Sequence, residues 1–359
     1  MLHWLLGFRD LGWDVWIVEE LPSDACVNAL GEKCAPEDSV NVSSWNAFVA
    51  DHGFTGRASL FIEGSSPDQD ALRDFAKDAS LFLNYAGQFS HLDLFDKVRC
   101  KAYLDVDPGY TQTWAKAYQC NMNFEGHDAF ITVGAAFGRP ECRIPQTGHS
   151  WIPTLPPVYI PFYESLTAGI TVCQPWTTVT HWYGVGEVEC DGLTLRSKRD
   201  SFLPLIDLPR KLGGEILIAS DVQPDWEDYP GFYAQGWRFC DAGTVCENID
   251  SYVKFMASSR GELGIAKEGY VTTRTGWFSD RSVAYLACGR PVVALETGWS
   301  TLVPESLGLL PFGNADEAVS QMRRVEQHYD EAVASARRIA AEVFSSRVVL
   351  PALLKKLGL

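Results

Sequence analysis

Short apolar stretches alternate with amphipathic stretches along the first half of the chain. The apolar stretches have strand length and are rich in β-branched and aromatic residues; they lie at 14–19, 58–63, 81–85, 101–106 and 129–133. Apolar residues at helical spacing occupy 1–11, 43–54 and a segment from Pro67 to about Lys77. Strands that alternate with helices predict a parallel α/β sheet.

Polar residues stand where three of these strands end. Asn84 follows one strand, Asp105 and Asp107 follow the next, and Thr132 and Gly134 follow a third. Ligands of parallel α/β sheets bind outside the carboxyl ends of the strands. We therefore expect these residues to face one crevice.

The same alternation returns after a proline-rich stretch. Residues 139–165 are so rich in proline that we expect no regular element there, and we place a linker at 151–166. Strands are then expected at 169–173 or 177–182, 193–195, 215–219 and 237–240, and helices at 200–212, 229–236, 249–259 and 346–357. This organisation predicts an N-terminal domain at 1–150, a C-terminal domain at 167–340 and a terminal segment at 341–359.

The stretch 268–291 predicts a strand, a tight loop, a helix and a new strand. Residues 270–272 have strand character, Gly276 interrupts them, and Ser279 and Asp280 are good N-caps for a helix that ends at Gly289. A helix N-terminus after a glycine turn offers free N–H groups and a positive dipole end, which suit a phosphate. Arg274 and Arg281 flank this turn and can add charged hydrogen bonds.

The segment Ala287 to Val293, A-x-G-x-P-V-V, resembles the donor-nucleotide segment of GT-B glycosyltransferases. Pro304, residues 308–310 and residues 316–318 fit the strand and helix that follow it in that family. The resemblance covers the chain from about Tyr252 onward and is only architectural before it. It implies an α/β fold with two Rossmann-like domains facing a central cleft, and a helical C-terminus that returns to the N-terminal domain.

The resemblance also implies a set of site residues and a nucleotide diphosphate sugar as donor. We expect the phosphates near Gly276, Ser279, the backbone of Asp280, and Arg281, with Arg274, Lys267 and Arg260 close by. Glu296, Thr297 and Gly298 follow the next strand and should contact the sugar; Thr178 and His181 are weaker candidates. Replacing Arg281 by alanine should then weaken donor binding with little change in melting temperature.

Three features depart from the family. Ala284 stands where many retaining members have a glutamate for the donor ribose, and Arg274 or Thr275 stands where plant-type members have a histidine. The first strand and glycine loop that should precede helix 1–11 are absent from the sequence. Either the start codon is assigned late, or the domain is unusual.

Two residues are candidates for a catalytic base. Asp105 can act as a base toward an acceptor hydroxyl, whereas Asp107-Pro108-Gly109 also has the composition of a simple turn. His3 is either an acceptor-side residue or an ordinary surface or core histidine, and His149 is more typical of a hinge. The D-x-D spacing of Asp105 and Asp107 is not accompanied by the architecture of metal-dependent relatives, so no metal is inferred.

Composition narrows the class of protein. Net charge is −16, which argues against nucleic acid and anionic membranes as partners, and no apolar run is long enough for a membrane span. The ten cysteines include no C-x-x-C pair, which indicates reduced thiols, a cytoplasmic location and no zinc site. Twelve tryptophans suit core packing, with Trp151, Trp277 and Trp299 as candidates for stacking surfaces.

The main hypothesis is a metal-independent glycosyltransferase that needs no cofactor besides its donor. Its acceptor is expected to be a small, neutral or lipid-like molecule of the kind found in natural product biosynthesis. A nucleotide-sugar epimerase and a catalytically inactive binding protein on the same scaffold are the alternatives. The sequence leaves a monomer and a homodimer open.

Overall fold

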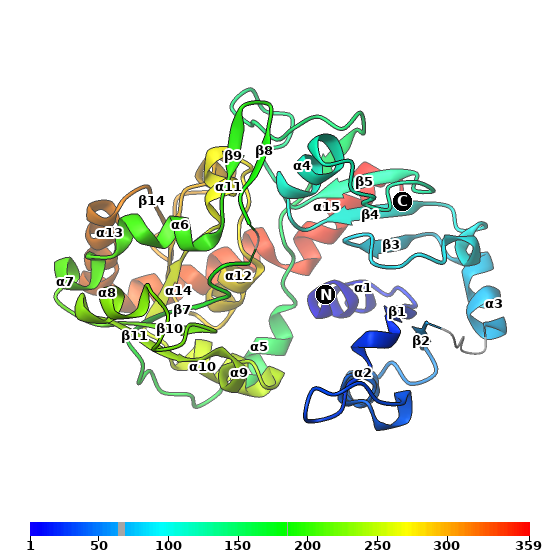
Figure 1. The fold of residues 1–359 in the computed structure, drawn as a ribbon, viewed down its shortest axis with the longest axis horizontal. Helices are drawn as coiled ribbons and strands as arrows, with labels where there is room; N and C mark the ends of the chain where they lie inside the picture. The colour runs from blue at the N-terminus through cyan, green and yellow to red at the C-terminus, as the bar shows by residue number, and fades with distance from the viewer. Residues whose placement is uncertain (64–68, 185) are drawn as a thin grey trace.

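The computed structural model describes residues 1–63, 69–184 and 186–359. Two groups of parallel strands lie side by side, each surrounded by helices (Figure 1). In the N-terminal half, β3 (Phe82–Tyr85), β4 (Lys101–Asp105), β5 (Ala129–Thr132) and β6 (Trp151–Pro153) form one parallel sheet in that order. A separate parallel pair consists of β1 (Ile17–Leu21) and β2 (Ala58–Ile62).

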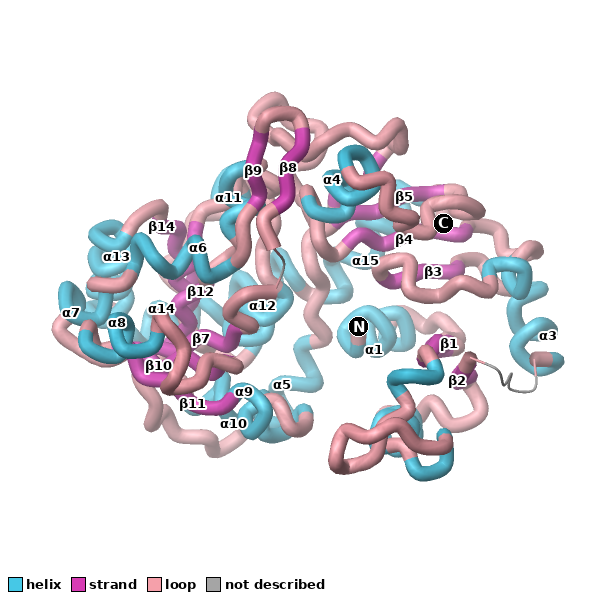
Figure 2. Tube along the Cα trace, in the orientation of Figure 1, coloured by secondary structure: helices cyan, strands magenta, loops and turns pink. Residues whose placement is uncertain are grey.

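The C-terminal half contains a six-stranded parallel sheet in the order β11-β10-β7-β12-β13-β14. Its strands are β7 (Trp176–Thr180), β10 (Ile216–Ser220), β11 (Trp237–Asp241), β12 (Gly261–Gly264), β13 (Val292–Leu295) and β14 (Leu309–Phe312). An antiparallel hairpin, β8 (Val188–Cys190) and β9 (Leu193–Leu195), projects toward the N-terminal half (Figure 2). The α/β architecture with two Rossmann-like sheets agrees with the prediction.

Helices follow the strands in both halves. In the N-terminal half they are α1 (Leu2–Asp10), α2 (Val40–Asp51), α3 (Asp70–Asp78) and α4 (Tyr110–Ala117), and α5 (Ile160–Leu166) follows β6. The others are α6 (Lys198–Phe202), α7 (Leu208–Leu212), α8 (Tyr229–Ala234), α9 (Ala242–Val245), α10 (Ile249–Ser258), α11 (Glu268–Thr272), α12 (Asp280–Ala287), α13 (Ala315–Gln327), α14 (Tyr329–Ile339) and α15 (Ser346–Leu357). The last of these crosses to the N-terminal half and packs on α1 (Figure 1).

Two expectations about secondary structure in the C-terminal half are corrected. Residues 270–272 form part of helix α11 and not a strand, because Thr273 closes a helical turn on the Gly269 carbonyl and Tyr270 is buried. The strand is β12, which begins and ends in glycine and so gives little β signal. The helix expected at 200–212 is broken into α6, a 3₁₀ turn and α7, because Pro204 and Pro209 lack the N–H group that a helix interior needs.

The proline-rich segment is more regular than expected. Strand β6 pairs with β5 at the edge of its sheet, and Pro153 is its last residue. Helix α5 has a proline in its first turn, where the missing N–H group costs nothing. Of the alternatives for the first strand of the C-terminal half, the structure matches 177–182. Pro67, expected to open a helix, lies outside the described residues.

Buried apolar side chains fill both faces of the six-stranded sheet, and α1 and α15 share a core with β4 and β5. That shared core includes Trp4 and Phe8 from α1 and Leu350 and Leu353 from α15. The terminal helix therefore belongs to the core of the N-terminal half.

Candidate functional site

The candidate site lies at the N-terminus of α12, at the carboxyl ends of the C-terminal strands. Ser279 is the N-cap of α12 and is buried, but its side chain makes no capping bond. The first N–H groups of a helix have no partner within it, and the helix dipole is positive there. The helix predicted after Ser279 is confirmed as α12, and the Arg281 N–H in its first turn donates to the Asp280 carboxylate at 2.9 Å.

Arg281 is held below the surface and is not free in the cleft. Its Nε donates to Glu262 Oε1 at 2.5 Å, and its Nη1 donates to the carbonyl of Val179 at 2.7 Å. Burial opposes the charge of Arg281, but the Glu262 carboxylate outweighs it and raises the pKa of the guanidinium. Arg281 Nη2 and Glu262 Oε2 are both buried without a hydrogen-bond partner.

Lys198, at the first position of α6, is a candidate site residue that was not predicted from the sequence. It makes no hydrogen bond or ion pair with another residue that the structure describes. Burial lowers the pKa of Lys198, and the nearby positive charges of Arg281 and Lys267 lower it further. A lysine at the start of the helix after the first strand of the C-terminal half is a signal that could have been noticed. Lys198 and Arg281 together form a cationic site without a full set of anionic partners.

Lys267 and Arg260 occupy different positions from those expected. Lys267 donates to Asp107 of the N-terminal half at 2.7 Å, so its charge is already paired. Arg260 precedes β12, at the opposite end of the sheet from the site. It donates to Glu326 at 2.6 Å and stacks on the ring of Tyr329, so the structure does not bring Arg260 to the site.

The loop around Gly276 contacts the loop that follows β13. The Gly276 N–H donates to the Thr297 carbonyl at 2.8 Å, and Thr297 Oγ1 donates to the Trp277 carbonyl at 2.6 Å. The Gly276 amide is therefore unavailable to a phosphate, contrary to expectation. Glu296 Oε1 accepts from the Gly298 N–H, so the predicted sugar-binding residues lie together. Arg274, whose backbone has the left-handed conformation, is exposed and lies next to Gly298.

Space on the inner side of this loop is small. The cavity between Ser279, Arg281 and the ends of β12 and β13 has a volume of only about 10 Å³. A phosphate group cannot enter it. The outer side of the α12 N-terminus carries exposed Asp280, whose carboxylate is close enough to Lys198 and His3 to affect both pKa values. An anion would approach α12 from this outer side.

Asp105 is contradicted as a catalytic base by its surroundings. Its carboxylate is completely buried and accepts from Thr111 (2.7 Å), Gln112 (2.9 Å), Thr132 (2.7 Å) and the Asp107 N–H (3.0 Å). Burial raises the pKa of Asp105, and these donors oppose the rise. Three of these donors belong to the β4–α4 turn and the start of α4, and the fourth, Thr132, ends β5, which supports the turn interpretation over the catalytic one.

His3 lies on α1 at the edge of the cleft between the halves. Its Nε2 is 2.9 Å from the hydroxyl of Tyr163, and its Nδ1 is buried without a partner. Burial lowers the pKa of His3 to about 4, so the imidazole is neutral at pH 7. A neutral ring of such low basicity is a poor general base but can accept or donate a hydrogen bond.

The remaining candidates lie on or after β7 and in the N-terminal half. Thr178 is buried on β7, and its hydroxyl has no partner. His181 follows β7, is exposed, and pairs through Nδ1 with Asp221 at 2.6 Å. His149 stacks on Phe130 in the N-terminal half. Within the described residues, no three or more His, Cys, Asp or Glu side chains are grouped to hold a metal ion, and metal independence stays a prediction.

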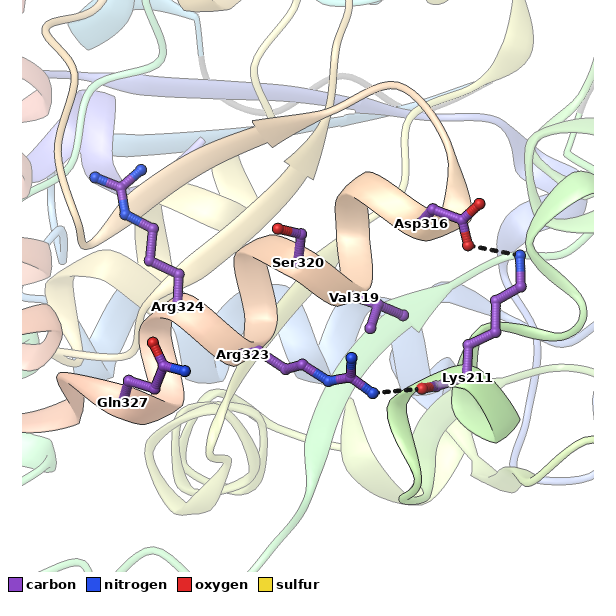
Figure 3. Close-up of a pocket in the computed structure, with 7 residues that line it drawn as sticks. All are labelled: Lys211, Asp316, Val319, Ser320, Arg323, Arg324 and Gln327. Atoms are coloured by element: carbon purple, nitrogen blue, oxygen red, sulfur yellow. Dashed lines mark hydrogen bonds and ion pairs between the residues drawn. The ribbon is translucent and has the colours of Figure 1, made fainter.

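A larger hollow of about 590 Å³ lies elsewhere, along α13 and next to α7 (Figure 3). Its cations already have partners: Lys211 pairs with Asp316 at 2.8 Å, Arg323 donates to the Lys211 carbonyl, and Arg324 pairs with Glu305. This hollow is a surface of internal ion pairs and not a second anion site.

Comparison with protein-family models and with curated protein sequences gives no match. Among solved structures, Anabaena Alr3699/HepE in complex with UDP and glucose aligns with a TM-score of 0.54 at 13% identity, covering 96% of this chain and 100% of that chain. Sucrose-phosphate synthase (tll1590) from Thermosynechococcus elongatus aligns with a TM-score of 0.51 at 10% identity, covering 96% and 99%. These likenesses confirm the predicted GT-B fold. No helix in the described part of the chain is long and apolar enough to cross a membrane.

Proposed function

We propose that this protein is a glycosyltransferase that moves a sugar from a nucleotide diphosphate to a small-molecule acceptor without a metal ion. The observation that carries the proposal is the unpaired Lys198 beside the α12 N-terminus and the partly satisfied Arg281, at the carboxyl ends of parallel strands. Fixed positive charge at this place matches the charge of a diphosphate.

The chemistry explains why cations matter more here than a strong base. Breaking the bond between the sugar and the diphosphate leaves negative charge on the leaving group. Preorganised N–H groups and cations stabilise that charge as it develops and need no rearrangement at the moment of reaction. The Glu262–Arg281 pair keeps the guanidinium in place beneath the helix end, and Lys198, which forms no ion pair with a described residue, lies near this pair and Asp280.

We propose uridine diphosphate as the nucleotide part of the donor. The support is that Alr3699/HepE, with the same fold, was solved with UDP and with UDP-glucose. Glu296, Thr297 and Gly298 lie on the loop beside Arg274 and Gly276, which makes them the nearest candidates for the sugar hydroxyls.

The reaction is tested by incubating the protein with UDP-glucose and other UDP-sugars, with and without a panel of neutral and lipid-like acceptors. The proposal predicts release of UDP that rises with one acceptor and persists in a metal chelator. Conversion of one UDP-sugar into another without acceptor would favour an epimerase. Binding of UDP with no turnover would favour a binding protein. Of the two alternatives this one has more support, because Asp105, the predicted catalytic base, is completely buried.

We propose that the protein works in a reducing compartment, the cytoplasm. All ten cysteines are free, and Cys120, Cys173 and Cys246 are exposed. Exposed thiols persist where disulfide formation is not favoured.

A further inference from the structure

A slot between two parallel strand edges divides the N-terminal half. Among the described residues, strand β1 pairs with β2 alone, and β3 is the edge of the four-stranded sheet. Between them is a cavity of about 570 Å³, lined by residues 17–20 of β1 and by all of β3. Figure 2 shows β1 and β2 apart from β3, with α1 alongside.

The two edges run in the same direction. Before the amino end of β1, Trp16 contacts Phe75 of α3, the helix that leads into β3, with ring centroids 5.3 Å apart. Near the carboxyl end of β1, the Glu20 carboxylate accepts from the N–H of Ser90, which follows β3, at 2.7 Å. Equivalent ends of the two strands therefore lie together.

Both edges present peptide groups to the slot. The Ile17 N–H donates to the Arg57 carbonyl and the Leu21 carbonyl accepts from Glu63, so the alternate residues Val18 and Glu20 face away from β2. By the same alternation, the Phe82 and Ala86 N–H groups donate toward β4, which leaves those of Leu83 and Tyr85 facing the slot. No other strand of the described residues pairs with these edges, although the Glu20 N–H interacts with the Glu19 carboxylate. Strand edges of this kind are templates for another strand.

Apolar side chains line both faces of the slot, together with the carboxylates of Glu19 and Glu20 of β1. Trp4, Leu5 and Phe8 of α1 line one side, and Leu72, Phe75 and Ala76 of α3 also line the cavity. The side chains of Leu81, Leu83 and Tyr85 pack with the core that contains α1, whereas Phe82 packs with the core that contains α3. A strand buried on both faces needs apolar residues at successive positions.

We propose that this slot is a binding surface for one extended, apolar peptide strand. The strand pairs with β1 on one edge and with β3 on the other, in parallel, and joins the two sheets into one. Only an extended peptide offers N–H and C=O groups to both edges at once, which excludes a folded domain, a nucleic acid or a lipid as the matching occupant. About five residues, at ~3.3 Å each, fill the length of β1.

The carboxyl end of the strand would lie at the cleft. Met1, Asn84 and Tyr85 line that end of the cavity. Burial, with a smaller contribution from the Asp280 carboxylate at the α12 N-terminus, raises the pKa of Tyr85 to about 12. A bound strand would therefore leave the slot facing the site on α12.

The test fuses a five-residue valine- and isoleucine-rich strand to Met1 through a short glycine-serine loop. The matched control carries prolines at alternate strand positions, which removes the donors but keeps the apolar character. Amide hydrogen exchange is measured on both proteins and on the unmodified chain.

The proposal predicts that the Val18, Glu20, Leu83 and Tyr85 amides exchange at least about tenfold more slowly in the strand fusion. The Glu19 and Asn84 amides, which face their existing neighbours, should change little, and the proline control should match the unmodified chain. Equal exchange in all three proteins overturns the proposal, as does equal protection by the proline control, which would indicate apolar filling only.

If the strand fusion does not fold, the same strand is added to the unmodified chain as a free peptide. Slower exchange at the four slot-facing amides, absent with the proline-containing peptide, then supports the proposal. No change at saturating peptide, or the same protection by an apolar small molecule, counts against it. Neither outcome depends on whether a nucleotide sugar binds.

Discussion

At the scale of single residues, charge placement distinguishes what the sequence could and could not predict. The α12 N-cap and the neighbourhood of Arg274, Gly276 and Thr297 follow from local sequence and are seen in the structure. The pairing of Arg281 with Glu262 joins helix α12 to strand β12, and no local pattern could reveal it. Lys198 lies about eighty residues before Arg281 in the sequence. No local sequence pattern could therefore place it at the site.

Replacing Arg281 by alanine should destabilise the protein. The substitution leaves the completely buried Glu262 without its counter-ion, and breaking a buried pair in this way costs about 3–5 kcal/mol. This revises the expectation from sequence of little change in melting temperature. Urea unfolding measures it; the double variant Arg281→Met with Glu262→Leu should recover much of the loss. An unchanged midpoint for the single variant would contradict the described pair.

Lys198 should make stability depend on pH in a defined direction. Because its pKa is lowered in the folded state, the unfolded chain binds more protons between that lowered pKa and the ordinary value of about 10.4. Stability from this group therefore rises with pH across that window. The free energy of unfolding of the wild type, minus that of Lys198→Met, should increase as the pH rises toward the ordinary lysine value of about 10.4. A difference that falls or stays constant would show that Lys198 is not desolvated.

At the scale of elements, strands with strong β composition and long helices were predictable, whereas short elements depended on tertiary contacts. Helix α15 matches its predicted range, and β9 matches its own. Helix α11 was predicted to be a strand, because Tyr270 has high β propensity. In the structure its hydroxyl donates a hydrogen bond to Asp107 of the N-terminal half, and this tertiary contact fixes Tyr270 in the helix. The edge strand β6 was missed because its prolines, read alone, argue against any regular element.

The contact between α1 and α15 can be tested with two glycine-to-alanine substitutions, one expected to lower the stability of the protein and the other to raise it. A Cβ on Gly7 would lie 2.6 Å from Ser346 Cβ and 2.8 Å from Leu350 Cδ1, so Gly7→Ala should destabilise by about 1–3 kcal/mol despite its better helix propensity. Gly231 in α8 is the control, since its added Cβ would meet nothing closer than 3.5 Å. Gly231→Ala should stabilise by about 0.5–1 kcal/mol. Thermal unfolding of both variants measures these changes in stability. Stabilisation by Gly7→Ala would contradict the close packing of α15 on α1.

Asp105 is tested at the level of the β4–α4 turn. Asp105→Ala leaves several buried donors without their acceptor, so stability should fall by about 2–4 kcal/mol. Transfer per folded molecule should be nearly unchanged, because no acceptor can reach the buried carboxylate. Loss of turnover in a variant that still binds UDP and keeps its melting temperature would restore Asp105 to a catalytic role.

At the scale of the whole molecule, the two halves are connected through loops as well as through α15. Lys267 pairs with Asp107, and the Ala136 N–H donates to the Thr275 carbonyl at 3.0 Å. The Arg143 N–H donates to the Thr273 carbonyl at 2.7 Å. These bonds join the N-terminal half to the same loop that leads into α12, so the position of the donor site depends on both halves. The two α/β halves were predictable from the alternation of strands and helices, and the GT-B architecture from the resemblance of the Ala287 to Val293 segment; this bonding between the halves was not predictable.

The account depends most on whether the α12 N-terminus with Lys198 binds a nucleotide diphosphate. Titration calorimetry with UDP-glucose on the wild type and on Lys198→Ala tests this directly. We predict saturable binding by the wild type and a loss of about tenfold to a hundredfold in affinity for the variant, with no loss of thermal stability. Equal affinity of the two proteins, or no binding of any nucleotide diphosphate sugar by the wild type, would contradict the account.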